Sequence, residues 1–179
     1  IRIIGTAGRL VKQKNHKLFL ESAKIVLERY SKIKFLIAGE GILKEKIIEQ
    51  AKKLNIEKNV FFLGEVKNMP EFYKKIDLFA LTSSWEGTPI VIMEAIASGL
   101  PIVATNVGGV NEIIDDKFGE FLVEPENSNK FAQKLIYLIE NTQIAKKTAK
   151  HSREKIKSDF SIKRKVKEMQ KLYQSLIKK

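Results

Sequence analysis

The stretch SSWEGTPIVIMEAIASGLPIVATNVGGVNE, residues 83–112, decides the fold of this chain. Its middle part predicts a helix over residues 90–98 with clear signals at both ends. Thr88 suits the cap before a helix, and Pro89 suits the first helical position. Gly99 suits the left-handed residue that follows a helix. The stretch therefore predicts a short, well-bounded helix between two apolar runs.

The same alternation of apolar runs and helical patterns continues on both sides of this stretch. The apolar runs expected to form strands are residues 1–7, 34–38, 60–63, 77–82, 102–105 and 121–123. Helical spacing fills residues 19–30, 43–54, 70–75, 90–98, 110–114 and 128 to the end. This alternation predicts the α/β class, as a Rossmann-like, doubly wound parallel sheet of about six strands with helices on both faces.

Length and composition are those of a globular domain. The chain has 179 residues, of which 44% are hydrophobic and 30% are charged. It contains no cysteine, which excludes a disulfide, a thiolate metal site and a cysteine nucleophile and fits a cytoplasmic location. The chain begins at Ile1 inside an apolar run, so we expect a cut N-terminus. No apolar run is long enough to cross a bilayer.

The positive charge is concentrated at the C-terminal end. Residues 146–179 carry 13 Lys and Arg but 3 Asp and Glu, so they hold +10 of the net charge of +12. We therefore divide the chain into a domain, residues 1–145, and a basic helical extension expected to pack on it. Apolar residues keep helical spacing in the extension, which also allows contact with a missing domain or with an anionic membrane at its inner face. The body is close to neutral, so no nucleic-acid partner is expected.

Two carboxylates flank the predicted start of the central helix. Unpaired backbone N–H groups at a helix start favour an anion, for which a diphosphate is the natural candidate. Glu86 lies in the preceding loop and Glu94 lies inside the helix among apolar residues. A carboxylate in such a place needs hydrogen-bond donors, which sugar and ribose hydroxyls supply. The alternative is that Glu94 faces solvent or pairs with a lysine.

Two glycine turns follow the first two predicted strands. Gly8 permits close approach of the backbone, and Arg9 and Lys14 follow it. These two cations either neutralise a diphosphate or are ordinary surface charges. Gly39 and Gly41 resemble the start of a dinucleotide fingerprint that lacks its third glycine, so we expect a tight turn lining a cleft.

In their order and spacing, these features resemble the C-terminal domain of the family 4, or group 1, glycosyltransferases. Its signature is two glutamates separated by seven residues, which here are Glu86 and Glu94 with GTPIVIM between them. Other matching segments are Gly8-Arg9-Leu10 with Lys14, Gly39-Glu40-Gly41, Phe62-Leu63-Gly64 and Ala97-Ser98-Gly99-Leu100-Pro101. The resemblance covers residues 2–145 and implies the C-terminal half of a GT-B fold, whose N-terminal acceptor domain is absent from this chain.

The resemblance also implies roles for individual residues. The catalytic groups would be Glu86 facing the transferred sugar and Arg9 and Lys14 on the donor diphosphate. Glu94 would bind the ribose hydroxyls. The remaining donor-binding residues would be Gly8, Gly39 and Gly41 in the two glycine turns, Glu65 and Val66 along the nucleobase, and Gly87, Thr88, Pro89, Ile90 and Val91 near the sugar and phosphates. This sequence departs from the family pattern at two points. Asn15-His16 stands where a glycine is frequent, and Thr88-Pro89 replaces an aromatic-glycine pair.

The implied function is retaining transfer of a hexosyl group from a nucleoside-diphosphate sugar to a glycan, lipid-linked or small-molecule acceptor. UDP is favoured from family frequency, and no metal or cofactor is expected. The full-length protein would be the enzyme, whereas this chain alone would bind the donor without efficient turnover. The alternatives are another GT-B enzyme, such as a sugar-nucleotide epimerase or a phosphorylase, or a non-catalytic basic binding domain.

Overall fold

The computed structural model describes residues 2–114 and 121–177. Its core is one parallel sheet of six strands, as predicted, in the order β3-β2-β1-β4-β5-β6. The strands are β1 (Ile3–Ala7), β2 (Lys34–Ala38), β3 (Val60–Gly64), β4 (Leu78–Leu81), β5 (Ile102–Thr105) and β6 (Leu122–Val123). Strand order reverses between β1 and β4, so the ligand crevice is expected at their carboxyl ends.

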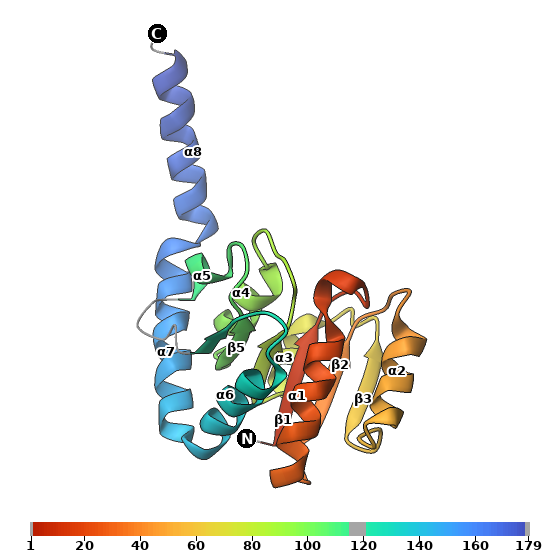
Figure 1. Ribbon diagram of the computed structural model, residues 1–179. Helices are drawn as coiled ribbons and strands as arrows, with labels where there is room; N and C mark the ends of the chain where they lie inside the picture. The colour runs from red at the N-terminus through yellow and green to blue at the C-terminus, as the bar shows by residue number, and fades with distance from the viewer. Residues whose placement is uncertain (1, 115–120, 178–179) are drawn as a thin grey trace.

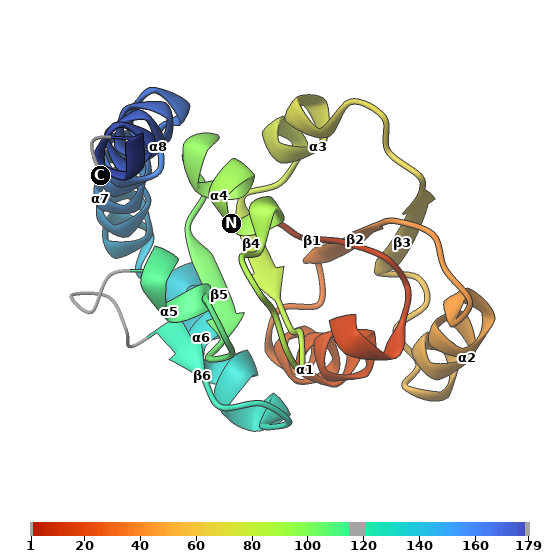
Figure 2. The same cartoon turned by 90° about the horizontal axis from the view of Figure 1, so that it is seen from above.

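Helices cover both faces of the sheet, as predicted (Figure 2). The helices are η1 (Lys12–Lys14), α1 (His16–Arg29), α2 (Lys44–Lys53), α3 (Met69–Lys75), α4 (Ile90–Ala97), α5 (Val110–Ile113), α6 (Ser128–Glu140), α7 (Thr142–Asp159) and α8 (Ile162–Ile177). Helices α1, α2 and α6 bury apolar side chains against one face, and α3, α4, α5 and α7 contribute to a separate core on the other.

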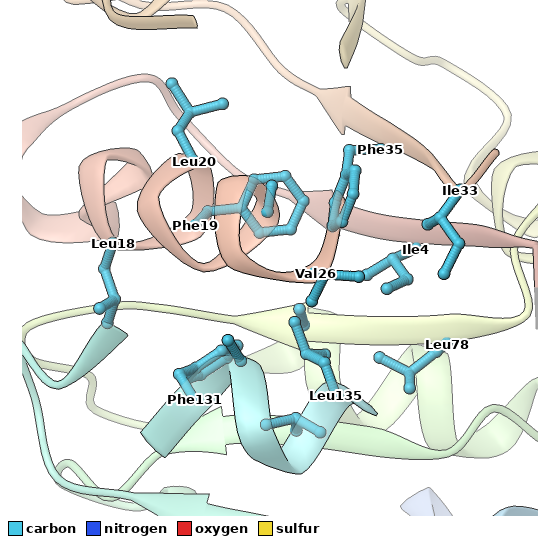
Figure 3. Close-up of a cluster of buried hydrophobic side chains, with 14 of the residues drawn as sticks. Ile4, Leu18, Phe19, Leu20, Val26, Ile33, Phe35, Leu78, Phe131 and Leu135 are labelled. Carbon is cyan, nitrogen blue, oxygen red and sulfur yellow. The ribbon is translucent and has the colours of Figure 1, made fainter. Parts of the chain in front are cut away.

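Burial on both faces explains why the strands read as continuous apolar runs. Every residue of β4 and β5 is buried, which is typical of a parallel sheet covered on two sides. Figure 3 shows α1 and α6 meeting the sheet around Phe19, Phe35 and Phe131. The rings of Phe19 and Phe35 pack edge to face with their centroids 5.6 Å apart. This packing holds α1 against β2.

The start of α4 corrects one prediction. Thr88 does not cap the helix; the capping position is Pro89, which is extended (φ −76°, ψ 97°) and makes no side-chain cap hydrogen bond. The helix therefore begins at Ile90, because the extended proline keeps the preceding segment out of the helical conformation. The expected helix end is confirmed by the left-handed Gly99 (φ +84°). The first turn of α4 is left without a side-chain acceptor for its amides.

The basic extension behaves as two different helices (Figure 1). Helix α7 packs against α4 and buries Ile156, and the boundary expected at residue 145 falls inside it. Helix α8 has no buried residue and points away from the domain, so the expected packing of residues 146–179 on the domain is wrong for α8. Its apolar residues instead form an exposed stripe. No helix in the described part of the chain is both long and apolar enough to span a bilayer.

Candidate functional site

A cavity of about 360 Å³ opens at the carboxyl ends of β1 and β2, beside the reversal of strand order. Predicted site residues in its wall are Gly8, Arg9, Gly39, Glu65, Val66, Val91 and Glu94. They come from segments far apart in the sequence, and the parallel sheet brings them to one edge. A larger hollow of about 740 Å³, around Arg29 and Lys32, lies at the amino ends of the strands, where such sheets do not bind ligands.

Close approach of two loops shapes this cavity. Gly39 has φ +142°, and a Cβ there would lie 1.9 Å from the carbonyl oxygen of Gly8. Only glycine permits this approach, which lets the Gly39 amide donate to the carbonyl of Gly64 at 2.7 Å. Gly41 does not line the cavity. A Cβ there would lie 2.5 Å from the Leu10 carbonyl oxygen, so Gly41 serves loop packing.

The guanidinium of Arg9 is the cation in the cavity wall. Arg9 is exposed, and its guanidinium makes no hydrogen bond or ion pair with the residues that the structure describes. A guanidinium presents several N–H donors in a fixed plane that matches phosphate oxygens. Arg9 is therefore available to an anion in the cavity.

The carboxylate of Glu94 is held at the cavity by a residue that the sequence interpretation missed. The hydroxyl of Tyr73, from α3, donates to Oε2 of Glu94 at 2.8 Å. Tyr73 is 2% exposed, and burial, together with the neighbouring carboxylate, raises its pKa. Tyr73 therefore stays a donor to one oxygen of Glu94. Glu94 itself is exposed to solvent, and it pairs with no lysine among the described residues. In the sequence, an aromatic residue at this position of a helix is expected to belong to the hydrophobic core. No sequence pattern therefore identifies Tyr73 as a partner of Glu94.

Glu86 and Lys14 form an ion pair beside the cavity. The ammonium of Lys14 donates to Oε1 of Glu86 at 2.5 Å, and the two side chains are 16% and 7% exposed. Neither residue lines the cavity itself. The stem of Lys14 lies against Gly8, within 3.2 Å of where its Cβ would be. The stem of Lys14 therefore contacts a residue of the cavity wall.

The loop after Glu86 stays outside this cavity. Gly87, Thr88 and Ile90 are exposed, whereas Pro89 is buried. A second glycine turn supports this loop, because the amide of Gly109 donates to the carbonyl of Gly87 at 3.0 Å. The exposed loop faces solvent in this structure, so its predicted contacts with a sugar and phosphates remain predictions.

The departure from the family pattern after Lys14 has a local explanation. Asn15 takes the left-handed conformation (φ +44°, ψ 51°) that a glycine favours. Asparagine tolerates this conformation better than most residues. Its side chain also accepts a hydrogen bond from the amide of Leu18 at 3.3 Å and caps α1. Asn15 therefore replaces glycine and adds a helix cap.

His16, the first residue of α1, predicts a pH-dependent stability. It is 3% exposed, and burial, together with the charge of Lys14, lowers its pKa from 6.5 to about 4. As the pH falls from 6.5 toward 4, the unfolded chain binds a proton that the folded chain does not. We expect the free energy of unfolding to fall by ~2 kcal/mol from pH 7.5 to 5 on this account.

Urea unfolding of the wild type and of His16→Gln at both pH values measures this contribution. The variant is expected to lose ~2 kcal/mol less than the wild type over the same interval. An equal loss in both proteins would contradict the prediction.

Metal ligands are not gathered at this edge of the sheet. Within residues 2–114 and 121–177, no group of three or more His, Cys, Asp or Glu side chains is placed to hold a metal ion. The cations that the site offers to an anion are side chains, Arg9 in the cavity wall and Lys14 beside it.

Comparison with known proteins gives consistent matches. The model of the family "Glycosyl transferases group 1" matches residues 2–155. The Escherichia coli UDP-Gal:alpha-D-GlcNAc-diphosphoundecaprenol alpha-1,3-galactosyltransferase is 31% identical over 173 residues, which are 95% of this chain and 44% of the relative. The poly(ribitol-phosphate) alpha-N-acetylglucosaminyltransferase of Staphylococcus aureus (strain COL) is 32% identical over 161 residues, 89% of this chain and 33% of the relative. The chain thus spans less than half of either relative.

Solved structures share the fold. A TarM variant from S. aureus, solved with fondaparinux, alpha-GlcNAc-glycerol and UDP, matches with a TM-score of 0.90 and 30% identity over 96% of this chain and 35% of that one. The C-terminal domain of a group 1 family protein (LpcC) from Francisella tularensis matches with a TM-score of 0.82 and 28% identity over 90% of this chain and 87% of that domain. With the sheet order and the family match, these similarities show that this chain belongs to the group 1 glycosyltransferases and has the fold of their C-terminal domain.

Proposed function

We propose that this chain binds the nucleotide-sugar donor of a retaining hexosyltransferase and that the nucleotide is UDP. The observation that carries the proposal is the cavity at the switch point, which Arg9 and Glu94 both line. A diphosphate and a ribose need one cation and one acceptor of hydroxyl protons, which these two side chains supply. The names of two relatives, one a UDP-galactose enzyme and one solved with UDP, agree with this nucleotide.

The proposed roles follow the positions of the side chains. Arg9 binds the diphosphate. The ammonium of Lys14 also reaches the diphosphate, past Gly8, either by breaking its ion pair with Glu86 or by contacting both groups. Glu94 accepts from the ribose hydroxyls while Tyr73 holds its other oxygen. Glu65, with Val66, lines the cavity wall along the nucleobase, and Gly39 gives the backbone room.

Catalysis then rests on stabilising charge as the sugar leaves. Negative charge grows on the diphosphate, where Arg9, Lys14 and the uncapped amides of α4 from Ile90 onward oppose it. Positive charge grows on the sugar ring, which Glu86 faces, with Gly87, Thr88 and Pro89 beside it. No metal ion or cofactor takes part in this proposal.

The acceptor is proposed to bind a separate N-terminal domain, because the chain spans less than half of its curated relatives. The chain alone therefore binds donor without efficient transfer. The E. coli relative acts on a diphosphoundecaprenol-linked sugar by its name, which favours a lipid-linked acceptor. The exposed basic helix α8 is suited to binding anionic lipid at the cytoplasmic face of a membrane.

The stereochemistry of slow donor hydrolysis tests the proposed reaction. The natural full-length protein is incubated with UDP-hexoses and EDTA, and proton NMR identifies the first free sugar before it mutarotates. We expect the α-anomer from an α-linked donor, at a rate that EDTA does not change. Release of the β-anomer, or loss of activity with EDTA, would contradict retaining, metal-independent chemistry.

A further inference from the structure

The carboxylate of Glu86 has one oxygen held and one oxygen left open. The hydroxyl of Ser83 donates to Oε1 at 2.6 Å, and the ammonium of Lys14 donates to the same oxygen at 2.5 Å. Oε2 has no hydrogen bond to the described residues. The side chain of Glu86 is 7% exposed, so little water competes with these two donors. The two hydrogen bonds therefore set the orientation of the carboxylate.

Ser83 is itself anchored from the neighbouring strand. It is fully buried just after β4, and its carbonyl accepts a hydrogen bond from Oγ1 of Thr105 at 2.6 Å. Thr105, at the end of β5, is also fully buried. Two buried hydroxyls therefore connect the end of β5 to the carboxylate of Glu86.

The backbone around Glu86 leaves little room for other orientations. A Cβ at Gly108, which has φ +49°, would lie 1.8 Å from the carbonyl oxygen of Glu86. Before this loop, the hydroxyl of Thr82 donates to the carbonyl of Lys14 at 3.1 Å. The loop that carries Glu86 is thus seated between the turn after β5 and the segment after β1.

The two donors to Glu86 differ in what a bound diphosphate does to them. The ammonium of Lys14 is a mobile charge that the diphosphate of a donor attracts. The hydroxyl of Ser83 is neutral and buried, so it stays with the carboxylate whether or not a donor is bound. A hydrogen bond to an ionised acceptor is among the stronger ones in proteins.

We propose that Ser83, anchored by Thr105, is a positioning residue that holds Oε1 of Glu86 so that Oε2 faces the transferred sugar. The inference rests on the proposed function, because it concerns the same site. It predicts that the Ser83 hydroxyl acts on the rate of transfer and leaves nucleotide affinity alone, since Glu94 and Arg9 lie elsewhere in the cavity wall.

The test compares Ser83→Thr with Ser83→Val in the natural full-length protein. Thr and Val have the same shape and differ in the hydroxyl, so any strain from the added methyl group affects both. We expect kcat for release of UDP from UDP-hexoses to be about 10- to 100-fold lower in the Val variant than in the Thr variant. The Kd for UDP is expected to agree between the two, whereas the Val variant is expected to unfold at a lower temperature because it lacks the hydrogen bond to Glu86.

The neighbouring Ser84 supplies the matched control. Its hydroxyl makes no hydrogen bond to the described residues, so Ser84→Thr and Ser84→Val should have equal kcat. Thr105→Val, which keeps shape and removes the donor to Ser83, should lower kcat and spare the Kd for UDP.

The outcomes separate this inference from the proposed function. Equal kcat in Ser83→Thr and Ser83→Val, with an active wild type, would overturn the role of Ser83. A lower kcat that comes with an equally weakened Kd for UDP would also overturn it, since the hydroxyl would then act on binding. A wild type that neither binds UDP nor releases it from any UDP-hexose would contradict the proposed function itself.

Discussion

Replacing Arg9 with alanine is expected to weaken UDP binding at least tenfold and to slow donor turnover by about 100- to 1000-fold. Arg9 lines the cavity and has no partner among the described side chains, so no protein contact competes with the diphosphate. The effect on rate exceeds the effect on binding because charge on the diphosphate grows as the sugar leaves. Calorimetry of UDP binding and kcat with a UDP-hexose measure the two effects.

Two controls show whether this loss is local. Uridine, which has no phosphate, should bind equally to the wild type and to Arg9→Ala. Lys58→Ala removes the same charge just before β3, at the opposite edge of the sheet, and should bind UDP like the wild type. If Lys58→Ala weakens binding as much as Arg9→Ala does, only the net charge matters and a specific contact is excluded.

Replacing Gly39 with alanine is expected to lower the free energy of unfolding by about 2–4 kcal/mol and to abolish measurable UDP binding. The left-handed φ of +142° disfavours alanine, and its Cβ would overlap the carbonyl oxygen of Gly8 at 1.9 Å. The loops after β1 and β2 must then move apart, which changes the shape of the cavity that both loops line. Urea unfolding and calorimetry measure both losses.

Gly87→Ala is the matched control for stability. A Cβ at Gly87 meets no atom within 4 Å, and its φ is not in the left-handed region. Its free energy of unfolding should stay within about 0.5 kcal/mol of the wild type. A Gly39→Ala protein as stable as Gly87→Ala would contradict the close approach of the two loops.

The sheet was predictable because its strands are buried on both faces. Runs such as residues 34–38 and 102–105 are apolar apart from Lys34 and Thr105 at their ends, and their predicted limits agree with β2 and β5. The start of α4 was less predictable. The cap expected at Thr88 depends on backbone angles that the adjoining proline changes, and a residue pattern alone does not report them.

The cavity wall was partly predictable for a different reason. Parallel strands place their carboxyl ends at one edge, so Arg9 after β1 and Glu65 after β3 had to lie near each other. Their partners were not predictable. Tyr73 and Ser83 reach the two glutamates through side-chain orientation, and both read as ordinary core residues in the sequence.

In the C-terminal extension, the sequence pattern predicts the helices but not their packing. Helical spacing of apolar residues indicates a helix with an apolar face, which α7 and α8 both have. The spacing does not say what covers that face. In α7 it is the domain, through Ile156, whereas the apolar stripe of α8, which includes Val166 and Tyr173, is covered by none of the described residues.

The central claim, that the cavity beside β1 and β2 binds the nucleotide, is tested most directly by calorimetric titration of the chain with UDP, GDP and ADP in EDTA. We expect UDP to bind with micromolar to low-millimolar affinity, more tightly than GDP or ADP, and Glu94→Ala to weaken that binding at least tenfold through loss of the ribose contact. Unchanged UDP affinity in a folded Glu94→Ala protein, or no binding of any nucleotide to the folded wild type, would contradict this placement of the donor site.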